Sequence, residues 1–198
     1  MPTVTEDRAR GAPRLIETAH LVLREWRDED LEPMARIDRD PTVTRYLRNP
    51  PATPFTRRET EELVTRIRAH WEEHRFGLYA VVEKETEEFI GFIGLAIPAF
   101  LPQILPAVEV GWRLDPAFWG RGLATEGARA CLPVAFVDLR LHDVVSIGHA
   151  ENAASIRVME KLGMRHDRDA VHPAQGWPLR IFRLSRTEWQ AGAGGLRG

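Results

Sequence analysis

The pattern of apolar and polar positions divides the first half of the chain into helical and strand-like segments. Apolar residues recur three or four positions apart between Asp28 and Pro41, and again from Thr56 to about residue 74, which is the spacing of one buried helix face. Thr56 and Glu59 form the capping-box pattern of a helix start. Two of the predicted strands, residues 78–83 and 89–97, are joined by a short charged turn, and this pattern predicts an antiparallel hairpin. The strands predicted in this half are residues 21–25, 78–83, 89–97 and 108–114.

In the second half, strand and helix patterns alternate. An apolar stripe predicts a helix at residues 123–139, and Pro133 inside it predicts a kink. A second helix is expected from Asn152 to residue 162, with Gly163 at the position where helices commonly end. The remaining predicted strands are residues 143–148, 164–168 and 179–185. The pattern indicates a mixed α/β (α+β) fold with a mainly antiparallel start and a β-α-β-α-β close.

Composition limits what kind of protein this is. The chain has 198 residues, of which 43% are apolar and 28% charged, typical of one globular domain, which we place at residues 15–190. Residues 1–14 and the glycine-rich residues 191–198 are predicted to be flexible ends. The net charge of −2 gives no general attraction to nucleic acid or to an anionic membrane. A single cysteine, Cys131, excludes an intrachain disulfide and favours a cytoplasmic location.

Residues 89–108 carry no charge and are long enough to suggest a membrane span. Pro98, Pro102 and Pro106 argue against a continuous helix, because each removes a backbone donor and clashes with the preceding turn. We therefore predict a buried strand followed by an apolar, proline-rich loop, and no membrane partner.

The segment WRLDPAFWGRGLAT, residues 112–125, predicts a strand, a tight turn and a helix start. The first amides of a helix have no internal partners and bind anions, and Gly120 and Gly122 let the backbone approach a ligand. Arg121 adds positive charge. The turn lacks the third glycine of a dinucleotide fingerprint and the Gly-Lys-Ser/Thr of a P-loop. On the glycines alone, a diphosphate cradle and a plain tight turn are equally good interpretations.

A second strand-to-helix junction follows in HAENAASIRVMEKLGM, residues 149–164. Asn152 stands where the helix begins and Ser155 about one turn later. An asparagine there is most often an N-cap, although it can also face the groove between two strands.

With these motifs in order, the chain resembles the GNAT acetyltransferase superfamily, in its RimJ/RimL-like N-acetyltransferase branch. The likeness covers about residues 15–189 and rests on LIETAHLVLREWRDEDLEPM, VEVGWRLDPAFWGRGLATEGARA and HAENAASIRVMEKLGMRHD. It implies a central mixed, mostly antiparallel, twisted sheet with splayed middle strands, flanked by helices. It also implies that acetyl-CoA donates an acetyl group to a primary amine, on a protein N-terminus or a small molecule, in a ternary complex.

The resemblance also implies which residues bind acetyl-CoA. Gly122 and Ala124 match the last two positions of the family motif Gln/Arg-x-x-Gly-x-Gly/Ala, whereas Trp119 departs from its first position. Asn152 would bind the pantetheine arm, and Met159 replaces a tyrosine acid found in many relatives. The full expected set is Trp112, Arg113 and Leu114 for pantetheine, and Trp119, Gly120, Arg121, Gly122, Leu123, Ala124 and Thr125 for the pyrophosphate.

Glu109 is the candidate general base, because the attacking amine must lose a proton and this carboxylate lies on the same strand as the pantetheine residues. A structural ion pair or a solvated position is an equally good interpretation. Ser155 is the candidate acid or thiolate donor, against simple bonding to its own helix backbone. Cys131 is assigned to the core, and the histidines lack a metal-ligand spacing, so no metal is expected.

The acceptor pocket is expected near the proline-rich loop, lined by Phe100, Leu101 and Trp177, whereas Trp71 fits core packing better. The apolar loop also makes a homodimer plausible. An acyl-CoA-binding protein without catalysis, acting in sensing or through a partner, is the alternative function.

Overall fold

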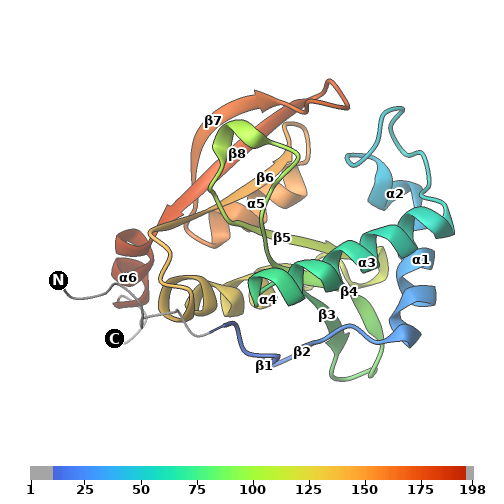
Figure 1. Cartoon of the computed structure of the whole chain (residues 1–198), viewed down its shortest axis with the longest axis horizontal. Helices are drawn as coiled ribbons and strands as arrows, with labels where there is room; N and C mark the ends of the chain where they lie inside the picture. Colours follow the sequence, from blue (N-terminus) through green and yellow to red (C-terminus); the bar gives the residue numbers. More distant parts are fainter. Residues whose placement is uncertain (1–10, 195–198) are drawn as a thin grey trace.

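In the computed structural model, which describes residues 11–194, the chain builds an eight-stranded sheet in the order β1-β2-β3-β4-β5-β6-β8-β7 (Figure 1). Every neighbouring pair is antiparallel except β5 and β6, which are parallel. The strands are β1 Leu15–Glu17, β2 Leu21–Arg24, β3 Leu78–Glu83, β4 Phe89–Ala96, β5 Glu109–Leu114, β6 Asp143–His149, β7 Arg165–Val171 and β8 Pro178–Ser185. This confirms the mixed, mostly antiparallel α/β sheet.

Six α-helices flank the sheet in the described range: α1 Leu31–Arg39, α2 Pro41–Thr44, α3 Arg57–His74, α4 Leu123–Pro133, α5 Ala153–Lys161 and α6 Arg186–Gly194. α1 packs against α3 and β4, while α4 packs against β2, β4 and β5. Gly127 lets α4 approach closely, because a Cβ there would lie 2.5 Å from Ile93 Cδ1. The main core fills the space between these helices and the sheet.

Several boundaries differ from the sequence prediction. The helix expected up to Pro41 ends at Arg39, and Pro41 opens the separate helix α2, because Asp40 is extended before the proline and its carboxylate caps Thr42. The long helix after the glycine turn ends at Pro133 and continues as a wider π-helical turn, Val134–Asp138, so the irregularity expected at this proline is present.

Three other elements were either not predicted or were predicted to be shorter than they are. Neither β1 nor α6 was predicted, and β7 runs three residues beyond the segment expected to end at Arg168. α6 reaches Gly194, so the first residues of the expected tail are helical. Residues 1–10 and 195–198, which make up most of the two expected flexible ends, lie outside the described residues.

The uncharged stretch forms the buried strand β4 and then a loop with a short 3-10 turn, Pro102–Ile104, as predicted. Within residues 11–194, no helix is long and apolar enough to cross a membrane. The loop is anchored by Leu101, which is buried in a second, smaller core with residues of β6, β8 and the hairpin before β8.

β5 and β6 diverge soon after they meet, as the resemblance implied. Their one paired position is Glu109 with Val145, where the Val145 N–H donates to the Val108 carbonyl at 2.9 Å. In a continued parallel ladder the Ile147 N–H would point at the Val110 carbonyl. It faces the Glu109 carboxylate instead. The sheet therefore opens at this carboxylate, and the gap beyond it is the floor of the cavity described next.

Candidate active site

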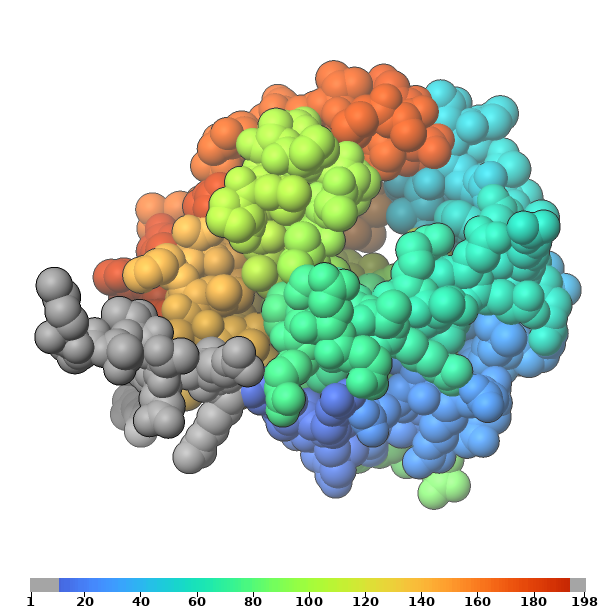
Figure 2. All heavy atoms as spheres, in the orientation of Figure 1, coloured from blue at the N-terminus to red at the C-terminus, as the bar shows by residue number. Residues whose placement is uncertain are grey.

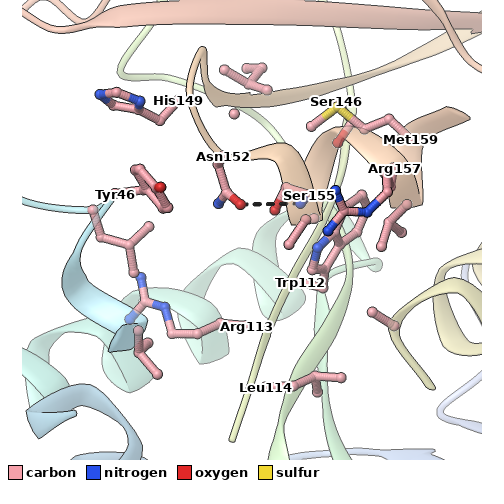
Figure 3. A pocket seen from close by; sticks show the side chains of 18 of the residues that line it. Tyr46, Trp112, Arg113, Leu114, Ser146, His149, Asn152, Ser155, Arg157 and Met159 are labelled. Carbon is pink, nitrogen blue, oxygen red and sulfur yellow. Dashed lines mark hydrogen bonds between the residues drawn. The ribbon is translucent and has the colours of Figure 1, made fainter. Parts of the chain in front are cut away.

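A cavity of about 630 Å³ occupies the gap between β5 and β6. Its walls come from the turn before α4, the start of α5, the segment after α2, the loop after β4 and the β7–β8 hairpin. In Figure 2 the last three of these border a hollow in the surface, coloured cyan, light green and orange. The Asn49 N–H donates to the Gln175 side-chain oxygen at 2.9 Å and so ties the segment after α2 to the hairpin. Figure 3 shows the side chains converging on the cavity from these elements.

The glycine turn forms one end of the cavity. Gly120 and Gly122 have φ of 76° and 83°, which favours glycine, and a Cβ at either position would meet nothing within 4 Å. The first main-chain bond of α4 runs from the Glu126 N–H to the Gly122 carbonyl, so the amides of residues 123–125 carry no helical partner. The predicted cradle is therefore open, and the residues lining it include Gly120, Gly122, Leu123, Ala124 and Thr125.

Trp119, which departs from the family motif, holds this turn against β5. Its indole N–H donates to the Leu114 carbonyl at 2.8 Å, while 46% of the side chain stays exposed. The indole thus fixes the entry to the turn and leaves the glycine amides open.

The sequence interpretation that Arg121 adds positive charge to the cradle is corrected here, because its guanidinium points elsewhere. Its guanidinium donates to the buried carboxylate of Glu83 at 2.7 Å, and Arg121 is not among the cavity-lining residues. Arg157 and Lys161, one turn apart on α5, do line the cavity. Arg157 makes no ion pair with any residue in the described part of the chain, so the free positive charge comes from α5.

The strand β5 supplies main-chain groups. The Asp115 N–H donates to the Ile90 carbonyl at 2.8 Å, and the register pairs Phe92 with Arg113, so alternate residues from Asp115 backwards bond to β4. Trp112 and Leu114 therefore direct their main-chain groups at the gap, where the Leu114 carbonyl also accepts the Trp119 indole N–H.

Arg113, also expected to pair with pantetheine, is engaged elsewhere. Its main chain belongs to the β4 ladder, and its guanidinium bonds the Asp38 carboxylate at 2.6 Å. On β5, the residues still expected to pair with pantetheine are therefore Trp112 and Leu114.

Glu109 stands at the point where the strands part. Its side chain lies on the same face as Gly111, because a Cβ built there would be 3.8 Å from Glu109 Oε1, as the predicted alternation requires. Burial raises the pKa of Glu109 to about 7, and the Ile147 N–H offsets part of that effect. No salt bridge to Glu109 is present among residues 11–194, so the interpretation of Glu109 as half of a structural ion pair is wrong.

The start of α5 faces the same gap. The Asn152 side-chain oxygen accepts a hydrogen bond from the Ser155 N–H at 3.1 Å, so this asparagine is an N-cap, and both residues line the cavity (Figure 3). An amide side chain keeps two N–H donors when its oxygen caps a helix. Met159 is buried at 1% exposure and leaves no acid at the position of the family tyrosine.

The other end of the cavity is aromatic. Phe100 and Trp177 line it as predicted, but Leu101 does not, because it anchors the loop in the second core. Sequence reasoning missed the aromatic residues that complete this end, Tyr46, His149 and His172. Tyr46 and His172 lie outside any motif, and nothing about His149 at the start of HAENAASIRVMEKLGM points to the acceptor, so chain folding alone brings the three together.

Two further expectations concern reactive groups. Burial raises the pKa of Cys131 to about 12, so its thiol stays protonated at neutral pH and belongs to the core, as assigned. Within the described range, no three histidine, cysteine or acidic side chains cluster as a metal site would need.

Comparisons with known proteins agree with this geometry. The pattern of the family described as acetyltransferase (GNAT) domain matches residues 20–165. FsC-acetyl coenzyme A-N(2)-transacetylase of Aspergillus fumigatus is 32% identical over 185 residues, covering 88% of this chain and 77% of that protein.

Solved structures share the fold. An acetyltransferase of Agrobacterium tumefaciens has a TM-score of 0.74 and 26% identity, covering 91% of this chain and 99% of that one. RimL, a ribosomal alpha-N-protein acetyltransferase solved with coenzyme A, has a TM-score of 0.67 and 16% identity, covering 86% of this chain and 97% of that one. The chain belongs to the GNAT family and is an acetyl-CoA-dependent N-acetyltransferase.

Proposed function

We propose that the protein moves the acetyl group of acetyl-CoA directly to a primary amine bound in the same cavity, with Glu109 as the general base. The observation that carries the proposal is the position of this carboxylate at the parting of β5 and β6, with a pKa raised to about 7 by burial. A base of that pKa is both free to accept a proton and strong enough to hold it near neutral pH.

Acetyl-CoA would lie along the gap, with its pyrophosphate on the amides of residues 123–125 and its pantetheine arm against the main chain of Trp112 and Leu114. Arg157 and Lys161 would neutralise the phosphates, because they line the cavity and Arg157 has no carboxylate partner among the described residues. This pose puts the thioester beside Glu109.

In the transfer, the amine nitrogen attacks the thioester carbon and forms the new C–N bond. Its proton passes to Glu109, directly or through one water, and the carbonyl oxygen becomes an oxyanion. The main-chain N–H of Trp112 is the proposed donor to this oxyanion, since it faces the gap without a strand partner. Collapse of the intermediate breaks the C–S bond, and the leaving thiolate takes up a proton, which gives coenzyme A and the amide.

Ser155 is the proposed donor to the leaving thiolate. Its main-chain N–H is fixed by Asn152, so the first turn of α5 is held in place while the hydroxyl remains on the cavity wall. With Met159 in place of the family tyrosine, this hydroxyl takes the place of a stronger acid, and we expect its removal to slow the reaction by less than loss of the base.

Release of free thiol from acetyl-CoA, followed against a panel of primary amines, tests the proposal. We expect Glu109→Gln to lower kcat by about 10²- to 10⁴-fold, the usual contribution of a general base, with unchanged acetyl-CoA affinity by calorimetry. Glu151→Gln, an exposed carboxylate at the turn before α5, is the matched control and should leave kcat unchanged. Full turnover in Glu109→Gln would remove the assigned base. Binding of acetyl-CoA without any amine-dependent thiol release would instead favour the non-catalytic alternative.

A further inference from the structure

The acceptor end of the cavity is a cluster of stacked and edge-packed rings, which we call the aromatic wall: Tyr46, Phe100, His149, His172 and Trp177. The Phe100 ring stacks on His172 with centroids 5.1 Å apart and planes 19° apart. Trp177 meets His149 edge-on at 5.5 Å and His172 edge-on at 5.7 Å. Tyr46 lies 5.1 Å from His149 and closes the wall from the segment after α2.

Both imidazole rings of the wall are held in one tautomer. The Nδ1 atom of His149 accepts the Glu151 N–H at 3.1 Å, and the Nδ1 atom of His172 accepts the main-chain N–H groups of Ala174 and Gln175 at 3.2 Å. Each neutral ring therefore carries its proton on Nε2. Rings fixed in this way present π surfaces to a bound molecule.

Among the described residues, the wall has no carboxylate that could form an ion pair with a second positive charge. Among the described residues that line the cavity, Glu109 is the one carboxylate, and its role as base needs it for the reacting amine. The basic side chains there are Arg113, Arg157, Lys161 and the two histidines, none of which attracts a cation. A polyamine would bring extra charges to a surface whose rings offer them cation–π contacts but no carboxylate partner.

Resting on the proposed function, we infer that the acceptor is a primary amine joined through a short carbon arm to an aromatic ring, and that the aromatic wall binds that ring. The main-chain N–H of Ile147 faces Glu109, and His149 is two residues further along β6, about 7 Å at strand spacing. An amine at Glu109 with a ring one or two carbons away fits that separation. A free arylalkylamine and a peptide with an N-terminal phenylalanine share this chemistry.

Acetylation of phenethylamine, 2-cyclohexylethylamine and spermidine, measured as thiol release, tests the inference. The wild-type protein should have a kcat/KM for phenethylamine about two- to tenfold above that for the cyclohexyl compound, the usual gain from ring contacts. The kcat/KM for phenethylamine should also exceed the kcat/KM for spermidine by about tenfold or more, because an unpaired charge is costly to bury. A tetrapeptide with N-terminal phenylalanine, compared with phenethylamine, separates a peptide source from a small molecule.

Phe100→Leu and Tyr46→Leu remove one ring each. Phe100 is 42% exposed, so this change should leave the fold intact. Either variant should raise the KM for phenethylamine about two- to tenfold while changing that for 2-cyclohexylethylamine less than about twofold. Leu105→Ala, on the same loop but outside the cavity lining, is the control and should change neither.

Three results would be decisive against the inference. Spermidine acetylated as well as phenethylamine, or equal values for the aromatic and cyclohexyl amines, would overturn the inference and leave the proposed function standing. No thiol release with any amine would overturn both.

Discussion

The two ends of the cavity are built by opposite strategies. The proposed cofactor end is mostly main chain: two glycines with positive φ, the first amides of α4 and the last residues of β5, to which α5 adds charged side chains. The acceptor end is side chain: rings from the segment after α2, the loop after β4, the end of β6 and the β7–β8 hairpin. In the proposed pose the first end would hold a ligand common to the whole family, and the second could change residue by residue without disturbing the first.

A negative charge placed in the glycine turn should weaken acetyl-CoA binding at the cofactor end and leave the acceptor end unchanged. Gly122→Asp puts a carboxylate beside the pyrophosphate, and repulsion at contact distance should weaken acetyl-CoA binding by at least about a hundredfold. Gly122→Asn is the matched control, because asparagine has the same shape, no charge and a tolerance for positive φ. Calorimetry should find near-normal affinity in Gly122→Asn. Equal affinity in the two variants would mean that the phosphates bind elsewhere.

Glu109 lies between the two ends, and its raised pKa has a consequence for stability. The native carboxyl keeps its proton up to about pH 7, whereas the unfolded one loses it near 4.5, so the folded state binds more protons between these values. The free energy of unfolding should therefore fall by about 2 kcal/mol as pH rises from 5 to 8. Denaturant unfolding should find this fall reduced by that amount in Glu109→Gln. The same pH dependence in both proteins would contradict the assigned pKa.

Substitutions of the two arginines near the cofactor end should have different effects, because the two side chains contact different groups. Arg157→Gln removes from the cavity a cation that has no carboxylate partner among the described residues, and it should weaken acetyl-CoA binding about tenfold. Arg121→Gln removes the same charge from the turn itself, but that arginine pairs with Glu83, so the loss should appear mainly as a lower Tm. A larger affinity loss in Arg121→Gln than in Arg157→Gln would restore the interpretation made from the sequence.

The same contrast explains what could be predicted. Local patterns and contiguous motifs predicted three features: the order of strands and helices, the glycine turn and the helix start at Asn152. The fate of Arg121 was not predictable, because Glu83 lies 38 positions away and no periodicity connects them.

The acceptor end was predictable only in part. The exposed apolar loop pointed to Phe100, but the same pattern could not tell that Leu101 turns into a second core. Neither His149 nor Tyr46 is singled out by the sequence pattern, and the two become neighbours only when the segment after α2 lies beside the end of β6. The π-helical turn after Pro133 and the edge strand β1 depend on packing in the same way.

The central claim is that Glu109 takes the amine proton where β5 and β6 part. The most direct test is the ratio of kcat/KM for wild type to that for Glu109→Gln between pH 5.5 and 8.5, since ionisation of the amine cancels in the ratio. With a pKa of about 7, this ratio should rise close to tenfold per pH unit at the acid end and level off above pH 7.5. A ratio that stays constant across the range would contradict the account.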